Sequence, residues 1–277
     1  MPSLGPRADD SWSANEFELQ AREDRKQRVI SLLAEGLPVP QGRIFELLRL
    51  LAQPVLDLNG ITEIVRTEPL LSTHVEGLLR SYSCDENPAK QASVSEFLIL
   101  LGSDRLRILA LGCALAEFAG KRLPAEIMRD FWQHSILTAL LSSRIAREAH
   151  PESVERAYLA GLLHDVGKLP LLVAAHERQE VAEDLLVAPH GEPEGERAYF
   201  GLDHTEVGRW MALSGNLPGW MIDVLTHHHD HASATEDPTL VAIVATADRC
   251  SRLSATDGSA PGEVTWKVAA SQPFGMN

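Results

Sequence analysis

A histidine and an aspartate stand side by side at His164 and Asp165, near the end of an apolar run. An imidazole nitrogen and a carboxylate are both ligands for divalent metal ions, and a carboxylate can bridge two ions. The run over residues 158–163 predicts a helix that ends before Gly167 and Pro170. An isolated His-Asp pair also arises by chance, and a core helix with a polar end would look the same. The pair becomes informative only together with other candidate ligands.

Two further candidate ligands interrupt the apolar faces of other predicted helices. His134 lies within the mostly apolar stripe of a helix predicted over residues 125–149, and Asp130 would lie one turn before it on the same side. Asp248 lies on the core face of an apolar run that begins at residue 240. Because an unpaired buried carboxylate is costly, Asp248 is expected to have a partner.

His204 is a candidate ligand at the start of another predicted helix. Asp203 and Glu206 have the spacing of a capping box, which places His204 in the first helical turn. The positive end of the helix dipole favours the neutral imidazole, which is the form that binds a metal ion.

Four histidines occur between residues 227 and 231. Helical spacing places His228 on a buried face with Met221 and Leu225, and it directs His229 and His231 away from that face. His227 stays open as an alternative. Because clustered surface histidines bind metal ions adventitiously, we expect only the inner-facing histidine to belong to a site.

Apolar residues recur at helical spacing along most of the chain, and no long stretch alternates with period two. The sequence therefore predicts an all-α fold, in which an amino-terminal helical bundle packs on a helical core that carries the candidate ligands. The expected parts are a polar leader (1–28), an amino-terminal lobe (29–122), a metal-binding core (123–254) and a tail (255–277). The acidic stretch 178–200 contains Pro and Gly residues and predicts a loop.

Composition restricts the partners. With 25 basic and 39 acidic residues the net charge is −14, which argues against a nucleic-acid backbone or an anionic membrane as the main partner. A metal ion could still supply positive charge for a small phosphate-containing molecule. The three cysteines are widely spaced without a CxxC pair, and the start of the chain has no signal-peptide pattern. We expect reduced thiols, a cytoplasmic protein and no membrane span.

The order and spacing of His134, His164-Asp165 and Asp248 resemble the HD superfamily of metal-dependent phosphohydrolases. The most specific part of this resemblance is Leu162-Leu-His-Asp-Val-Gly-Lys168. With His204 and a paired histidine, His228 or His227, the longer pattern is similar to the HD-GYP branch, which hydrolyses cyclic dinucleotides. Asp130 falls where that branch can place an extra carboxylate ligand. The paired histidines are followed by His231-Ala-Ser-Ala-Thr235, and no Gly-Tyr-Pro appears.

The first half of the chain resembles the HDOD domain, a bacterial signal-output relative of HD-GYP. The matching segments are Leu37-Pro-Val-Pro40, Glu68-Pro69-Leu70-Leu71 and Leu101-Gly102-Ser-Asp-Arg-Leu-Arg107, and the resemblance covers roughly residues 36–253. HDOD domains usually have an Asn-Ser pair after the second of these segments, and this chain has Ser81-Tyr82-Ser83 there. Many HDOD domains have lost metal ligands and are regarded as regulatory scaffolds, whereas this chain retains the full set.

The resemblance implies a signal-transduction phosphohydrolase or phosphodiesterase that acts on a nucleotide or cyclic dinucleotide. It implies two divalent ions, with Fe or Mn favoured and Zn, Ni or Mg as alternatives. The ligands would be His134, His164, Asp165 and Asp248 for one ion, and Asp165, His204 and the paired histidine for the other. Lys168 would neutralise phosphate charge, or else only cap its helix end. The alternative function is a non-catalytic HDOD module that binds a partner protein and uses the metal structurally.

Overall fold

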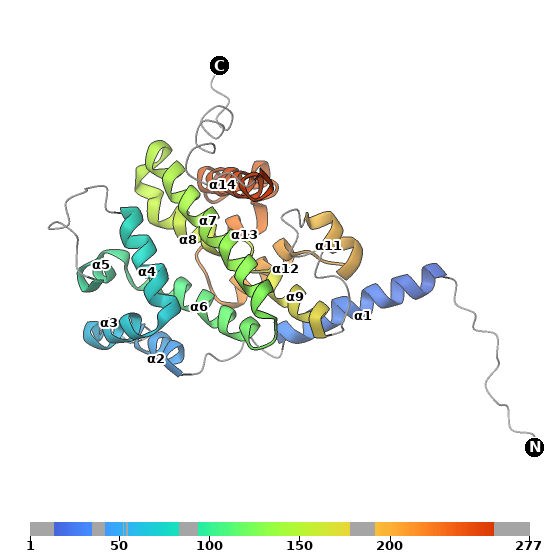
Figure 1. The fold of residues 1–277 in the computed structure, drawn as a ribbon, viewed down its shortest axis with the longest axis horizontal. Coiled ribbons are helices and arrows are strands. Elements are labelled where there is room, and N and C mark those ends of the chain that lie inside the picture. Colours follow the sequence, from blue (N-terminus) through green and yellow to red (C-terminus); the bar gives the residue numbers. More distant parts are fainter. Residues whose placement is uncertain are drawn as a thin grey trace, which may run out of the picture.

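The computed structural model describes residues 14–34, 42–51, 53, 55–82, 94–177 and 192–257. These residues form helices joined by turns and contain no strand, which confirms the all-α prediction (Figure 1). The α-helices are α1 (Ala14–Ala34), α2 (Gly42–Leu51), α3 (Leu58–Thr67), α4 (Pro69–Tyr82), α5 (Val94–Leu101), α6 (Ser103–Gly120), α7 (Ala125–Ala149), α8 (Val154–Leu163), α9 (Lys168–Glu177), α11 (Pro193–Phe200), α12 (His204–Ser214), α13 (Gly219–His227) and α14 (Pro238–Asp257). Single turns of 3₁₀ helix follow α7, as η2 (Pro151–Ser153), and α13, as η3 (His231–Ser233).

Helices α2 to α5 form one end of the molecule (Figure 1). Helices α2, α4 and α5 pack against α6, and α3 packs on these three helices. Each buries a stripe at helical spacing, as Ile61, Ile64 and Val65 do in α3. Helix α6 also contacts α8 and α9, so it is buried along most of its length. One hydrophobic cluster extends without interruption from Val29 to Leu225. The amino-terminal helices therefore share this core with α7 to α13, and a second, smaller cluster lies between α7, α8, α13 and α14.

The remainder of the fold is organised around α8, which packs along α7 and also contacts α14. Gly161 in the middle of α8 permits the close approach to α7. A Cβ atom at Gly161 would lie 2.9 Å from the Thr138 carbonyl oxygen and 2.7 Å from Ser142 Oγ. Any larger residue would push the two helices apart, and these helices carry His134 and His164.

The turn between α8 and α9 lies directly against the start of α12. A Cβ atom at Gly167 would lie 2.0 Å from the backbone oxygen of His204 and 2.7 Å from the backbone nitrogen of Gly208. A Cβ atom does not fit at such distances from backbone atoms, so only glycine permits this contact. The contact places Asp165, two residues earlier, next to His204.

The first helix begins at Ala14, well before Val29, so the prediction of a polar leader over residues 1–28 was wrong from residue 14 onward. Helix α1 packs on α9 and α11 (Figure 1). The Arg25 guanidinium lies 4.0 Å from the centre of the Tyr199 ring, and its Nη1 donates to the Tyr199 carbonyl oxygen at 3.1 Å. Because charged side chains make these contacts, α1 has only a weak apolar stripe. Apolar spacing alone therefore does not predict this helix.

Residues 193–200 form helix α11, so the prediction of a loop over 178–200 was wrong for this part; residues 178–191 lie outside the described residues. Pro193 begins the helix, and Gly201 ends it with a left-handed φ of 75°. Pro193, Glu196 and Phe200 are buried, at the spacing of one helical face. The many Glu and Gly residues of this stretch concealed a short amphipathic helix.

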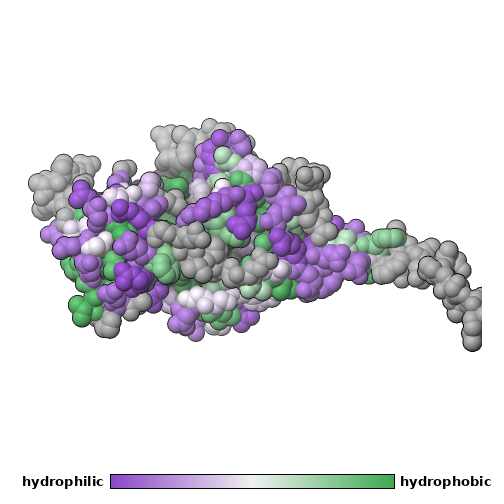
Figure 2. Space-filling model, turned by 90° about the horizontal axis from the view of Figure 1, so that it is seen from below, coloured by the Kyte–Doolittle hydropathy of each residue, from purple (hydrophilic) through white to green (hydrophobic). Residues whose placement is uncertain are grey.

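Among the described residues, the stretch Pro151–Glu177 has the length and composition of a membrane span, but it is buried inside the fold. This stretch consists of η2, α8, α9 and the turn between the two α-helices, so it is not one continuous helix. The face of the molecule in Figure 2 is mostly hydrophilic. Some hydrophobic surface is visible at the end formed by α2 to α5. Val55, Ile99 and Leu100 are exposed in this part of the chain.

Candidate metal centre

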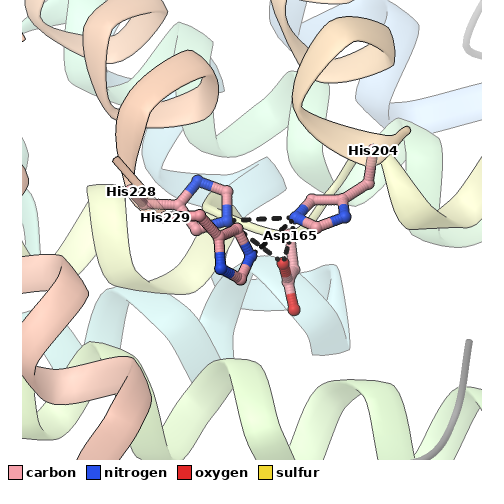
Figure 3. A group of neighbouring side chains, drawn as sticks. All are labelled: Asp165, His204, His228 and His229. Atoms are coloured by element: carbon pink, nitrogen blue, oxygen red, sulfur yellow. Dashed lines mark hydrogen bonds and ion pairs between the residues drawn. The ribbon is translucent and has the colours of Figure 1, made fainter. Parts of the chain in front are cut away.

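The structure brings candidate metal ligands from five helices and their ends into two adjacent groups. The first consists of His134, His164 and Asp248, and the second of Asp165, His204, His228 and His229 (Figure 3). Within each group the candidate ligand atoms lie within 4.8 Å of one another. Both groups could hold a metal ion.

In the first group, three side chains point their ligand atoms at one another from α7, the end of α8 and α14. Nε2 of His134 lies 3.3 Å from Nε2 of His164 and 3.2 Å from Oδ1 of Asp248. Nε2 of His164 lies 3.5 Å from the same Asp248 oxygen. Ligands held about 2.1 Å from one ion lie about 3 to 3.5 Å apart, so this triangle has the size of a coordination face.

In the second group, three imidazoles converge from the start of α12 and the end of α13 (Figure 3). Nε2 of His204 lies 3.1 Å from Nε2 of His228 and 3.1 Å from Nε2 of His229. These separations again suit neighbouring ligands of one ion.

Asp165 lies between the two groups and presents one carboxylate oxygen to each. Its Oδ2 lies 3.5 Å from Nε2 of His134 and 3.4 Å from Nε2 of His164. Its Oδ1 lies 3.3 Å from Nε2 of His204 and 3.5 Å from Nε2 of His228. Asp165 is buried, and among the described residues Oδ1 has no hydrogen-bond donor. A buried, unsatisfied carboxylate oxygen is costly unless a cation satisfies it.

Backbone carbonyls hold two of the histidines in the tautomer that a metal requires. Nδ1 of His164 donates to the Gly161 oxygen at 2.8 Å, and Nδ1 of His228 donates to the Val224 oxygen at 2.9 Å. A carbonyl only accepts, so the hydrogen-bond network assigns the proton to Nδ1 and leaves a lone pair on Nε2. These lone pairs point at Asp165, an arrangement that repels without a cation and fits one well.

Side chains orient His134 and His204. Ser251 Oγ donates to the Asp248 backbone oxygen at 2.8 Å, so it accepts from Nδ1 of His134 at 3.1 Å. Oε2 of the buried Glu196 accepts from both the backbone N–H of His204, at 2.7 Å, and its Nδ1, at 2.6 Å. Both contacts leave Nε2 facing the site.

Burial and neighbouring charges set the protonation states. Burial lowers the pKa of His164, and burial together with Lys168 lowers that of His204 well below its usual range. Burial opposes ionisation of Asp165, but His164 and Lys168 hold its pKa well below the usual range. Burial also opposes the charged form of His134, yet Asp165 and Asp248 raise its pKa to about 9. The position between these two carboxylates therefore attracts a cation, whether a proton or a metal ion.

Lys168, the residue expected to neutralise phosphate charge or to cap its helix end, lies beside Asp165. It is buried, and its Nζ donates to Oδ2 of Asp165 at 2.7 Å. Burial lowers the pKa of Lys168, but Asp165 and Glu196 more than offset this, so the pKa is raised and the ammonium form is favoured. The tight turn at Gly167 brings the two side chains together. Lys168 therefore has the buried Asp165 carboxylate as an ion-pair partner.

Two expected ligands lie outside both groups. Asp130 is on the exposed face of α7, where its carboxylate lies 3.6 Å from the Arg129 guanidinium, because the neighbouring positions Ile127 and Phe131 take the buried face. Nε2 of His227 lies 4.0 Å from Oδ1 of Asp223 and not with the other histidines. Spacing made Asp130 a candidate ligand and left His227 open as an alternative to His228, but the packing of the helices places neither of them in a ligand group.

His229 joins the second group, although helical spacing directed it away. Helix α13 ends at His227 and His228 forms its C-cap, so helical phase no longer applies at the next residue. Its Nε2 reaches His204 beyond the helix end. Burial and the neighbouring His228 lower the pKa of His229 to about 2, which keeps its ring neutral. The sequence also did not predict that Glu196 supports the site. Pro193 is a helix-start signal, and it could have indicated the short helix that carries Glu196.

Comparisons with known proteins agree with this fold. A crystal structure of an HDOD domain protein with unknown function from Geobacter sulfurreducens is 23% identical, has a TM-score of 0.59, and is matched over 91% of this chain and 86% of that one. Another, described as a candidate metal-dependent phosphohydrolase from Shewanella amazonensis, is 18% identical with a TM-score of 0.52, over 81% of this chain and 82% of that one. At these identities the likeness establishes the fold.

A curated relative, an uncharacterized protein of Treponema pallidum, is 22% identical over 255 residues, which is 89% of this chain but 48% of the relative. The chain thus spans about half the length of the curated relative it matches. The sequence profile of the HDOD domain matches residues 37–231, which is more than half of the chain and lies within the segment expected from the sequence. The chain belongs to the HDOD domain family.

Proposed function

We propose that this protein is a bacterial signal-transduction enzyme that hydrolyses a phosphoester of a nucleotide or cyclic dinucleotide at a two-ion centre. The observation that carries the proposal is the position of Asp165, a buried carboxylate with one oxygen facing each ligand group. A carboxylate shared in this way is the feature expected between two ions. Fe or Mn suits the mixed imidazole and carboxylate ligands best, with Zn, Ni or Mg as alternatives.

The residues of the centre would have two kinds of role, as metal ligands and as residues that orient those ligands. His134, His164 and Asp248 would hold one ion, and His204, His228 and His229 the other, with Asp165 between them. Two divalent ions in such a site supply Lewis acidity towards a phosphate oxygen and a nucleophilic water at neutral pH. Glu196 and Ser251 orient the imidazoles, and Lys168 fixes the bridging carboxylate. The buried helices around the site exclude bulk water from its floor.

The descriptions of similar structures support this proposal. The Shewanella amazonensis protein is described as a candidate metal-dependent phosphohydrolase. A structure from Marinobacter aquaeolei, 19% identical with a TM-score of 0.51, is described as a candidate signal transduction protein. We place the protein in the cytoplasm, because its three cysteines are widely spaced and form no CxxC pair. Its partners would be a phosphate-containing small molecule, a signalling protein, or both.

Metal analysis combined with a turnover screen tests the proposal. Purified wild type, loaded with Mn²⁺ or Fe²⁺, should bind two ions per chain and hydrolyse at least one of nucleotides, cyclic dinucleotides and generic phosphodiesters. Asp165→Asn should lower metal affinity and abolish turnover. Asp130→Asn, on the same helix as His134 but exposed, is the matched control and should change neither.

The same experiment separates catalysis from scaffolding. Stoichiometric metal binding without turnover of any tested phosphoester would replace the enzyme by a non-catalytic HDOD module in which the metal pins the fold. If neither elemental analysis nor titration detects bound metal, the proposal of a two-ion centre is wrong.

A further inference from the structure

A pocket of about 400 Å³ opens beside the second ligand group. Its volume is within the range that holds small organic ligands, which is about 300 to 1,000 Å³. The lining residues are Glu192, His228, His229, His231, Ala245, Arg249, Arg252 and Leu253. Because His228 and His229 belong to both the pocket and the ligand group, a molecule in the pocket lies against the proposed ions.

One face of α14 forms a wall of this pocket. Arg249 and Arg252 lie one helical turn apart on it, next to Asp248 of the first ligand group. Ala245 and the exposed Leu253 add apolar surface. A wall with guanidinium and apolar groups suits an organic molecule that carries anionic groups, since guanidinium binds phosphate in a bidentate manner.

The two arginines have different surroundings. Arg252 is held by ion pairs with Asp248 Oδ2 and, at 3.1 Å, with Oε1 of Glu192, so its charge is already balanced. Arg249 is exposed and has no ion-pair partner among the described residues. In a chain with a net charge of −14, its guanidinium is the cation of this pocket that remains available to a ligand.

We propose that this pocket binds a second anionic group of the substrate, and that Arg249 is the residue that selects for it. The reacting phosphate would lie at the ligand groups, and a further phosphate would bind Arg249, with the organic part against Ala245 and Leu253. The preferred substrate class is therefore an organic phosphate with two separated anionic groups. This inference rests on the proposed two-ion centre.

Binding measurements on Mn²⁺-loaded protein test this inference without requiring turnover. The probes are adenosine 5′-monophosphate and adenosine 3′,5′-bisphosphate, which differ by one phosphate group. Calorimetry on the wild type should give about tenfold tighter binding of the bisphosphate, the size of one charge-assisted contact. Arg249→Gln should remove most of that advantage and leave monophosphate binding nearly unchanged, whereas Arg249→Lys should restore part of it.

Arg209→Gln is the matched control, because Arg209 is an exposed arginine of α12 that does not line the pocket. It should preserve the preference. If the ratio of the two affinities is the same in wild type and Arg249→Gln, the inference is wrong while the two-ion centre stands. If the metal-loaded wild type binds neither probe, the inference is also wrong, and the turnover screen alone decides the proposed function.

Discussion

One oxygen of Glu196 accepts both the backbone N–H and the ring Nδ1–H of His204, at 2.7 Å and 2.6 Å. The carboxylate thus fixes where the histidine begins its helix and how its ring faces the site. Burial raises the pKa of Glu196 to about 8, while Lys168 opposes this shift. Glu196 belongs to α11, a helix whose outer side is covered by α1. The orientation of His204 therefore depends on a helix that contributes no ligand of its own.

Glu196→Ala should weaken binding of the second ion by about 10-fold to 100-fold, the usual effect of removing a carboxylate that orients a metal-binding histidine. Glu196→Gln retains an oxygen acceptor and should recover most of the affinity. Titration with Co²⁺, followed by its absorption spectrum, resolves the two ions. Equal, unchanged affinities in both variants would show that Glu196 has no part in orienting His204.

His229→Gln should lower the affinity of the second ion by at least about tenfold, since it removes one nitrogen ligand from the group. His231 lines the neighbouring pocket but belongs to neither ligand group, so His231→Gln should leave the metal content unchanged. Elemental analysis of both variants after dialysis makes the comparison. Equal losses would indicate a surface histidine cluster instead of a defined centre.

Lys168→Met should destabilise the metal-free protein by about 3 to 5 kcal/mol, because it leaves the buried Asp165 carboxylate without its counter-ion. Two bound ions would neutralise the same carboxylate, so the loss should shrink in metal-loaded protein. Urea unfolding with and without Mn²⁺ measures both values. Lys121→Met, which removes an exposed pair with Glu117, should cost less than about 1 kcal/mol in either state. A loss that is identical with and without metal would contradict the predicted role.

Gly167→Ala should cost at least about 2 kcal/mol, because the new methyl group meets the backbone of His204 and α12 must move away. The movement should weaken the second ion more than the first, since His204 belongs only to the second group. Gly120→Ala is the control, because a Cβ atom there meets nothing within 4 Å. Thermal unfolding and metal titration give the two readouts, and similar behaviour of both variants would refute the close contact.

His74, which lies outside the ligand groups, should make the stability of the fold depend on pH. It is buried against Trp132, neither ring nitrogen has a partner among the described residues, and burial lowers its pKa to about 4. The unfolded chain takes up the proton near pH 6.5 and the folded chain does not. Stability is therefore unaffected above about pH 6.5 and falls by up to about 3 kcal/mol as the pH decreases towards 4.

His74→Phe should remove this part of the acid sensitivity. The difference in unfolding free energy between pH 8 and pH 5 should be about 2 kcal/mol smaller than in the wild type. His231→Gln, at an exposed histidine, should keep the wild-type difference. An unchanged pH dependence in His74→Phe would mean that His74 is protonated in the folded protein.

The amino-acid sequence was sufficient for the helical fold and for most of the candidate centre. The helix expected over residues 125–149 has the same bounds as α7, because a long apolar stripe follows the break at Pro124. His164 and Asp165 could be selected as an adjacent pair, and His204 from the capping box before it. His134, His228 and Asp248 could be selected because each lies within a helix or at its end. There, helical phase predicts the direction of the side chain.

Only the tertiary structure decided which of these positions meet and what supports them. His229 reaches the second group beyond the end of α13, and Glu196 reaches His204 from a helix that the sequence presented as a loop. Asp130 has suitable spacing but lies on the exposed face of α7. Periodicity describes one helix at a time, whereas these outcomes depend on close contacts between segments far apart in the chain, such as that of Gly167 with α12.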